Sequence, residues 1–84
     1  MLELEKRSPL AFPIALKDGR MLETVGDAAD YLSKLNLDQR ERPHWRMVIM
    51  MFNNAMREPR YLRTATVNLR SALVYDRLVE DTGH

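Results

Sequence analysis

Apolar and polar positions near the start of the chain follow the two-residue period of β-strands. Two short apolar runs, residues 12–16 and 21–24, flank a polar segment that contains Asp18-Gly19. Asp-Gly between apolar runs is typical of a two-residue type I′ turn, in which both residues need positive φ. The pattern therefore predicts a β-hairpin. Pro13 lacks an N–H group, so its strand is expected to lie at a sheet edge.

Three later segments carry the helical period, in which apolar residues recur every three or four positions. The first is expected over residues 24–35, with Thr24 as its N-cap. The second is expected over residues 43–57, because Pro59 disfavours helical geometry at the residue before it. The third is expected over residues 59–79. We expect its core contact to stop near Leu73, because Asp76 and Glu80 continue the apolar face with charge.

These elements predict one α+β domain of the order ββααα, with the N-terminal hairpin covered by three helices. The polar residues 36–42 are expected to form a loop. Residues 1–10 are expected to be a flexible N-terminal arm, residues 11–80 the domain, and residues 81–84 a frayed C-terminus. The predicted core consists of Ile14, Leu16, Leu22, Leu32, Trp45, Val48, Ile49, Phe52, Leu62, Leu69 and Leu73.

Composition excludes several classes of protein. The 84 residues include no cysteine, which excludes disulfides, a thiolate nucleophile and cysteine-ligated metals. The longest apolar run, residues 47–52, is far shorter than the roughly 20 residues that a membrane helix needs. The N-terminus lacks the apolar stretch of a secretory signal. We therefore expect a cytoplasmic protein without a membrane partner.

Candidate catalytic and metal-binding chemistry is sparse. The only imidazoles belong to His44 and His84, and nucleophilic catalysis needs a base placed beside a serine, threonine or cysteine. Glu41 and His44 lie three residues apart, but Pro43 breaks any helical register between them. The three glycines are isolated and show no phosphate-binding spacing. We predict no enzyme, no catalytic, cofactor-binding or metal-binding residues, and no small-molecule substrate.

Charge is segregated along the chain, although the net charge is only +1. Residues 40–77 hold eight arginines against three acidic residues. On the predicted third helix, Arg60, Arg63, Arg70 and Arg77 fall within a sector of about 100°. Such a ridge could follow the phosphates of a nucleic acid, although arginine side chains more often cover apolar surface. Nucleic-acid binding through this ridge is therefore the alternative function.

Methionines supply the leading candidate for function. Met47, Met50 and Met51 lie off the apolar stripe of the second predicted helix, which is therefore apolar around most of its circumference. Such a helix is either buried on several sides or forms a partner surface, to which flexible thioethers are suited. We expect a small interaction or regulatory protein that self-associates through this helix or the hairpin edge. A protein partner, or a second copy in a homodimer, is favoured over nucleic acid.

Several short motifs resemble a known family. They include Phe12-Pro13-Ile14, the stretch from Thr24 to Leu32, His44-Trp45, Asn54-Ala55 and Thr64-Ala65. Over residues 12–75 the chain resembles a family of short bacterial proteins known as domain of unknown function 982. The segment from Val25 to Leu32 is the most specific part, because it resembles the family's Val-x-[Asp/Glu]-Ala-Ala-x-[Phe/Tyr]-Leu element. The resemblance implies a fold and a bacterial cytosolic setting, and it implies no catalytic residue.

Overall fold

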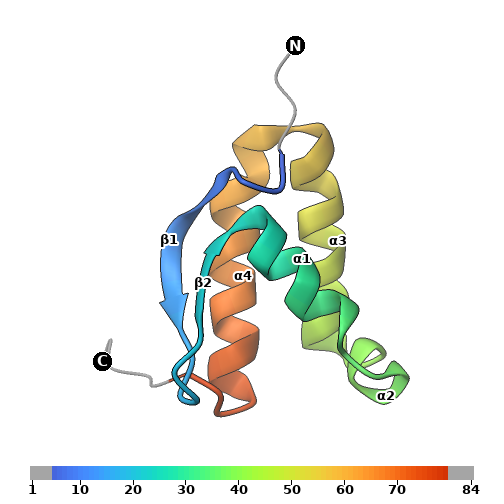
Figure 1. Cartoon of the computed structure of the whole chain (residues 1–84). Coiled ribbons are helices and arrows are strands. Elements are labelled where there is room, and N and C mark those ends of the chain that lie inside the picture. The colour runs from blue at the N-terminus through green and yellow to red at the C-terminus, as the bar shows by residue number, and fades with distance from the viewer. Residues whose placement is uncertain (1–4, 80–84) are drawn as a thin grey trace.

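The computed structural model of this chain describes residues 5–79, in which a hairpin is followed by helices (Figure 1). The elements are β1 (Pro9–Ala15), β2 (Met21–Thr24), α1 (Val25–Ser33), α2 (Leu37–Arg40), α3 (Pro43–Arg57), the 3-10 turn η1 (Pro59–Tyr61) and α4 (Leu62–Tyr75). The predicted α+β class with a leading hairpin is confirmed. The predicted number of helices is wrong, because the described residues form four α-helices rather than three.

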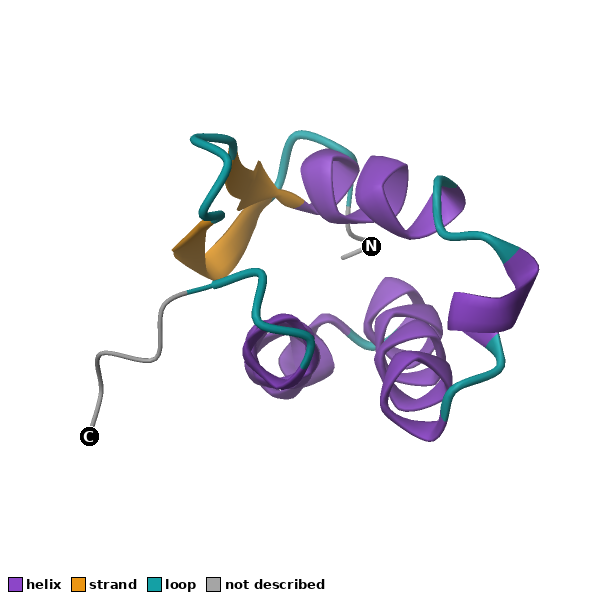
Figure 2. Ribbon diagram, turned by 90° about the horizontal axis from the view of Figure 1, so that it is seen from below, coloured by secondary structure: helices purple, strands orange, loops and turns teal. Residues whose placement is uncertain are grey.

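The elements form two layers (Figure 2). The hairpin and α1 make one layer, and the antiparallel pair of α3 and α4 makes the other. β1 packs on α4, while α2 contacts α3 and links the two layers. The hairpin, α1, α3 and α4 each bury apolar residues between the layers, which is how a domain this small obtains a single core.

The hairpin turn contains three residues, Lys17, Asp18 and Gly19, rather than the two predicted. The Leu16 N–H donates to the Arg20 carbonyl at 2.8 Å, and the Gly19 N–H donates to the Leu16 carbonyl at 3.0 Å. Gly19 has φ of 96°, whereas Asp18 keeps negative φ. This is a type I turn followed by a glycine bulge. The predicted type I′ turn is wrong. Asp-Gly is common both in the two-residue type I′ turn and in the three-residue loop, and in the three-residue loop only the glycine needs positive φ.

Replacing Gly19 with valine is expected to lower the free energy of unfolding by about 1–3 kcal/mol, because a β-branched residue is strained at positive φ. A Cβ at this position meets no atom within 4 Å, so the cost is conformational rather than steric. Urea denaturation measures it. The matched control is Gly19→Asn, which tolerates positive φ better and is expected to lose less. Equal losses in the two variants would contradict this explanation.

The start of α1 is fixed by a reciprocal cap. The Asp27 N–H donates to Oγ1 of Thr24 at 3.1 Å. The carboxylate of Asp27 accepts from the N–H groups of Glu23, at 2.9 Å, and Thr24, at 3.1 Å. The predicted N-cap at Thr24 is therefore confirmed, and the cap also anchors the end of β2.

Residues before β1 are bound to the same helix end. The Val25 N–H donates to the Ser8 carbonyl at 2.8 Å, and the Gly26 N–H donates to the Lys6 carbonyl at 2.6 Å. A Cβ on Gly26 would lie only 2.9 Å from that carbonyl oxygen, so the close approach requires glycine. Part of the predicted arm thus belongs to the fold, and β1 begins inside it. The start of that arm and the predicted frayed C-terminus lie outside the described residues.

Asp27→Asn is expected to lower the melting temperature at pH 7. The backbone N–H groups of Glu23 and Thr24 hold the pKa of Asp27 below its ordinary value. A lowered pKa in the folded state stabilises the protein above about pH 4 and ceases to do so as the pH falls through the lowered value. The difference in melting temperature from the wild type should therefore shrink between pH 7 and pH 2. As a control, Asp30→Asn removes only an exposed ion pair with Lys34. A constant deficit at every pH would contradict the prediction.

The predicted loop over residues 36–42 contains the short helix α2. Oδ1 of Asn36 accepts from the Gln39 N–H at 2.8 Å, and Oε1 of Gln39 accepts from the Asn36 N–H at 3.1 Å. This second capping box holds a helix of four residues, none of which is buried. The loop prediction failed because α2 depends on caps rather than on apolar periodicity.

The prediction for α3 is confirmed at both ends, with Pro43 at its first position and extended backbone at Glu58 before Pro59. The prediction for the last helix is wrong at both ends. Pro59 begins the 3-10 turn η1, and α4 begins only after it, at Leu62. At the other end, α4 stops at Tyr75 rather than near Val79.

A left-handed residue ends α4. Arg77 has φ of 64°. The Arg77 N–H donates to the Val74 carbonyl at 2.9 Å, and the Leu78 N–H donates to the Leu73 carbonyl at 2.8 Å. This pattern is a Schellman motif, which usually has glycine at the left-handed position. Because arginine occupies this position, the sequence has no glycine there to mark the end of the helix.

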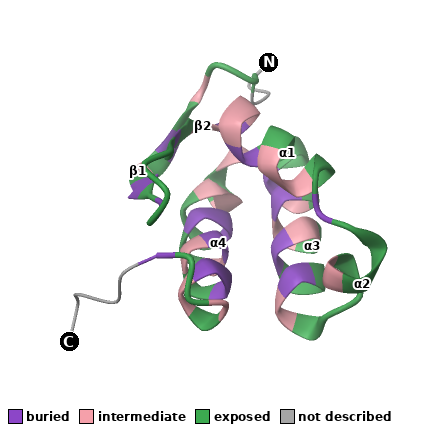
Figure 3. Cartoon of the chain, turned by 60° about the horizontal axis from the view of Figure 1, so that its bottom comes forward, coloured by how far each residue is buried: buried purple, intermediate pink, exposed green. Residues whose placement is uncertain are grey.

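The core lies between the two layers, where the buried parts of α3, α4 and the hairpin face one another (Figure 3). Eight of the eleven predicted core residues are buried, and Leu32, Ile49 and Leu62 are half-buried. Val79 is also buried, and the Leu78 carbonyl accepts from the Lys17 N–H at 2.9 Å. Leu73 is the last buried residue of α4, as expected, but core contact resumes beyond the helix at Val79. The buried residues that the prediction omitted are Leu10, Val25, Ala28, Leu35, Ala55, Ala65, Thr66, Ala72 and Val79.

Candidate interaction surface

Two of the three predicted methionines are exposed on the outer side of α3. Met47 and Met50 are 45% and 49% exposed, whereas Met51 is half-buried and packs against the core. At about 100° per residue, Met47 and Met50 point away from the buried Trp45. We call Met47 and Met50 the methionine surface. Arg46 lies next to it on the helix, so its edge is basic.

The hairpin edges are poorly suited to pairing with another strand. Pro9 and Pro13 remove two N–H groups from β1, whose register with β2 is irregular. The Ala11 N–H donates to a threonine side chain of α4. On β2, the Glu23 N–H is occupied by the Asp27 carboxylate. Neither strand therefore offers the continuous row of backbone donors and acceptors that strand addition needs.

The four arginines of the predicted ridge do not share one helix. Arg60 belongs to η1, Arg63 and Arg70 belong to α4, and Arg77 lies beyond the end of α4. Arg70 is half-buried and lines a depression beside β1 together with Lys17. Only Arg63 and Arg70 keep the helical spacing that the ridge required.

Arg60 is also engaged with its own neighbours. Its guanidinium pairs with Glu58 at 3.2 Å and lies over the ring of Tyr61, 5.0 Å from the ring centroid. The hydrogen bond to the Tyr61 hydroxyl and the Glu58 carboxylate raise the pKa of Arg60 above its ordinary value. Part of the positive charge expected for the ridge is therefore already neutralised.

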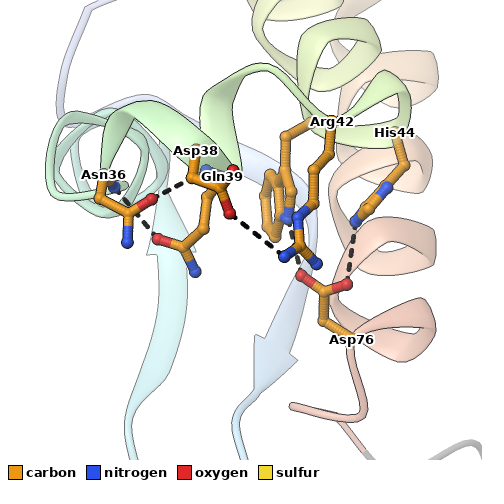
Figure 4. A network of polar contacts seen from close by, with 7 residues as sticks. Asn36, Asp38, Gln39, Arg42, His44 and Asp76 are labelled. Carbon is orange, nitrogen blue, oxygen red and sulfur yellow. Dashed lines mark hydrogen bonds and ion pairs between the residues drawn. The ribbon is translucent and has the colours of Figure 1, made fainter.

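His44 forms a polar cluster with Trp45 and Asp76 at the start of α3 and the end of α4 (Figure 4). Oδ1 of Asp76 lies 2.9 Å from Nε2 of His44, and Oδ2 accepts from the Trp45 indole N–H at 2.7 Å. The rings of His44 and Tyr75 are 4.6 Å apart between centroids. The His44 side chain is thus largely covered, because only 21% of it is exposed.

This cluster links two helices. A carboxylate only accepts hydrogen bonds, so Asp76 satisfies the indole of a fully buried tryptophan and the imidazole beside it. Together, the pair of His44 with Asp76 and the bond from the Trp45 indole join the start of α3 to the end of α4. The sequence did contain a signal for this contact: Asp76 continues the apolar face of α4, where a charge needs a partner.

A groove between α1 and α3 is the feature that the sequence analysis missed. Its volume is about 350 Å³. Both helices contribute apolar side chains to it, and Lys6 and Arg40 are its cations. Its lining residues are Lys6, Val25, Ala29, Leu32, Ser33, Arg40, Ile49, Phe52, Asn53 and Met56. Tertiary placement creates this groove, because its walls come from two helices that are separate in the sequence.

Metal-binding and membrane-spanning features are both missing from residues 5–79. No three histidine or acidic side chains in this part of the chain gather closely enough to hold a metal ion. None of its helices combines the length and hydropathy needed to cross a membrane.

Comparisons of the chain with protein-family models, curated proteins and solved structures gave no match.

Proposed function

We propose that this chain is a small non-enzymatic interaction protein that self-associates through the methionine surface of α3. The observation that supports this proposal is the exposure of Met47 and Met50 on the outer side of a long, well-anchored helix. Flexible apolar side chains on a rigid helix are typical of protein-binding surfaces. The occupied donors of the hairpin favour α3 over the hairpin edge, the other route to self-association.

The proposal takes precedence over nucleic-acid binding because the predicted arginine ridge is divided among three segments. Affinity for a nucleic acid depends on the number of phosphates contacted, and α4 alone presents two of the four arginines.

We separately propose that the chain is related to the family known as domain of unknown function 982. This proposal is supported by the segment from Val25 to Leu32, which forms a capped helix in the structure.

Self-association is expected to be weak. Two exposed methionines from each copy bury far less area than the roughly 1,200–2,000 Å² of a stable interface. We expect a dissociation constant of about 0.1–1 mM. Because Arg46 and Arg57 lie on the same side of α3, added salt should screen their repulsion and strengthen the dimer. Sedimentation equilibrium at several protein and salt concentrations measures both properties.

Met50→Lys is expected to abolish the concentration-dependent rise in mass, because it places a charge within the methionine surface beside two arginines. The substituted side chain is exposed, so the fold should be unchanged, as circular dichroism can verify. Val67→Lys is the matched control, because Val67 is 45% exposed on α4 and lies outside the methionine surface. A strict monomer at about 1 mM would refute self-association. A dimer that is weakened only by Val67→Lys would move the interface to α4.

A further inference from the structure

The groove between α1 and α3 carries an inference that is independent of self-association. We propose that it binds a single-chain anionic amphiphile, such as a fatty carboxylate, with the acyl chain along the groove and the carboxylate at Arg40. Ile49 and Met56 face this groove, whereas Met47 and Met50 lie on the outer side of α3. The two proposals therefore concern different faces of the same helix.

The groove has the size and the apolar lining of a small-molecule site. Its volume of about 350 Å³ lies within the range of small-molecule sites, which are mostly apolar with a few polar groups. The groove follows α1, whose nine residues span about 13 Å. Val25, Ala29 and Leu32 line it from this helix, at the spacing of one helical face. An elongated apolar strip suits an extended hydrocarbon chain.

The charged side chains that line the groove are all positive. Among residues 5–79, no acidic side chain lines the groove, whereas Lys6 and Arg40 do. The acidic residues of α1 are held on its other side: Asp27 caps the helix start and Asp30 pairs with Lys34. The groove therefore combines apolar walls with positive charge, which complements an apolar chain that ends in an anion.

Arg40 is the cation at which we place the carboxylate of the ligand. Nη2 of Arg40 donates to the Ser33 carbonyl at 2.9 Å, which holds the guanidinium at the C-terminal end of α1. That bond uses one of the five N–H groups of the guanidinium. A guanidinium pairs with a carboxylate through two parallel hydrogen bonds, whereas the Lys6 ammonium is a flexible point charge. Arg40 is thus the better-ordered partner for a carboxylate.

Titration of the full chain with octanoate, decanoate and dodecanoate below their micelle concentrations tests the proposal by NMR. Binding should shift the signals of Ala29, Leu32 and Met56, and each added methylene should tighten it about two- to fourfold. Decanol, which lacks the charge, should bind at least tenfold more weakly than decanoate. An absence of binding, or equal affinity for decanol and decanoate, would overturn the proposal. The second result would indicate a purely apolar groove of the kind that a partner helix covers.

Variants locate the two ends of the ligand. Arg40→Gln should weaken decanoate binding about tenfold and leave decanol unchanged, whereas Arg63→Gln on α4 should change neither. Lys6→Gln should have less than a twofold effect. A larger loss with Lys6→Gln than with Arg40→Gln would overturn the assigned orientation.

A third pair of variants tests the groove itself. Ala29→Phe should fill it and abolish decanoate binding, whereas Ser71→Phe, an equally bulky change at an exposed position of α4, should not. Undiminished binding to the Ala29→Phe variant would overturn the site. Shifts of the Ala29 and Met56 signals with protein concentration alone would assign the groove to a second copy and would also overturn the proposal. Failure of self-association leaves these measurements unaffected, because they are made on the monomer.

Discussion

Trp45→Ala is expected to lower the free energy of unfolding by about 3–5 kcal/mol, the largest effect of any substitution considered. Trp45 is fully buried between the layers, so alanine would leave a cavity lined by both helices of the pair and by α1. It would also leave Oδ2 of Asp76 without its indole donor. A domain of this size has little stability to spare, and chemical denaturation should show a large unfolded fraction in water.

Two further variants separate packing from hydrogen bonding in the same cluster. Trp45→Phe keeps an aromatic ring but removes the indole N–H, and is expected to cost less than alanine, about 1–3 kcal/mol. His44→Ala keeps the indole bond and removes the half-buried imidazole, at an expected cost of about 0.5–1.5 kcal/mol. If Trp45→Ala were no less stable than His44→Ala, Trp45 would not be the centre of the core.

Phe52→Ala is expected to have the second-largest effect, also within about 3–5 kcal/mol but below that of Trp45→Ala, because Phe52 is 7% exposed. One side of the ring belongs to the core and another side lines the groove between α1 and α3. Truncation would therefore open the groove toward the core. The denaturant midpoint should fall while the slope of the transition stays unchanged, which indicates lost stability without a change in surface exposed.

The matched control for this position is Phe52→Leu. It keeps most of the volume and is expected to cost less than about 1.5 kcal/mol. A similar loss for leucine and alanine would show that aromatic shape, rather than buried volume, is what the site requires.

Local rules were sufficient for most of the fold. The amphipathic stripe of α3, with Pro43 at its start and Pro59 beyond its end, predicted that helix correctly. Thr24 predicted the cap of α1 because an N-cap depends on residues three apart in the chain. The same wheel placed Met47, Met50 and Met51 off the core stripe, and of these Met47 and Met50 are exposed whereas Met51 packs against the core.

The features that sequence reasoning missed depend on contacts between distant segments. The end of α4 is set by Arg77 in a conformation that favours glycine, so no local signal marks it. The contact of Asp76 with Trp45 joins residues of different helices, and the charge on the apolar face was interpreted as the end of the core. The groove exists because α1 and α3, two helices that are separate in the sequence, both contribute walls to it, a relation that no single helix encodes.

The bond between the Lys17 N–H and the Leu78 carbonyl has a consequence for the order of folding. It joins the hairpin turn to the far end of the described chain, so closing it orders nearly every residue between. The pair of α3 and α4 is close in sequence and can form earlier at lower entropic cost. We therefore expect the hairpin turn to dock onto residues 78–79 late in folding. We expect the same junction to open early when the native state fluctuates, and the exchange rate of the Lys17 amide would report that opening.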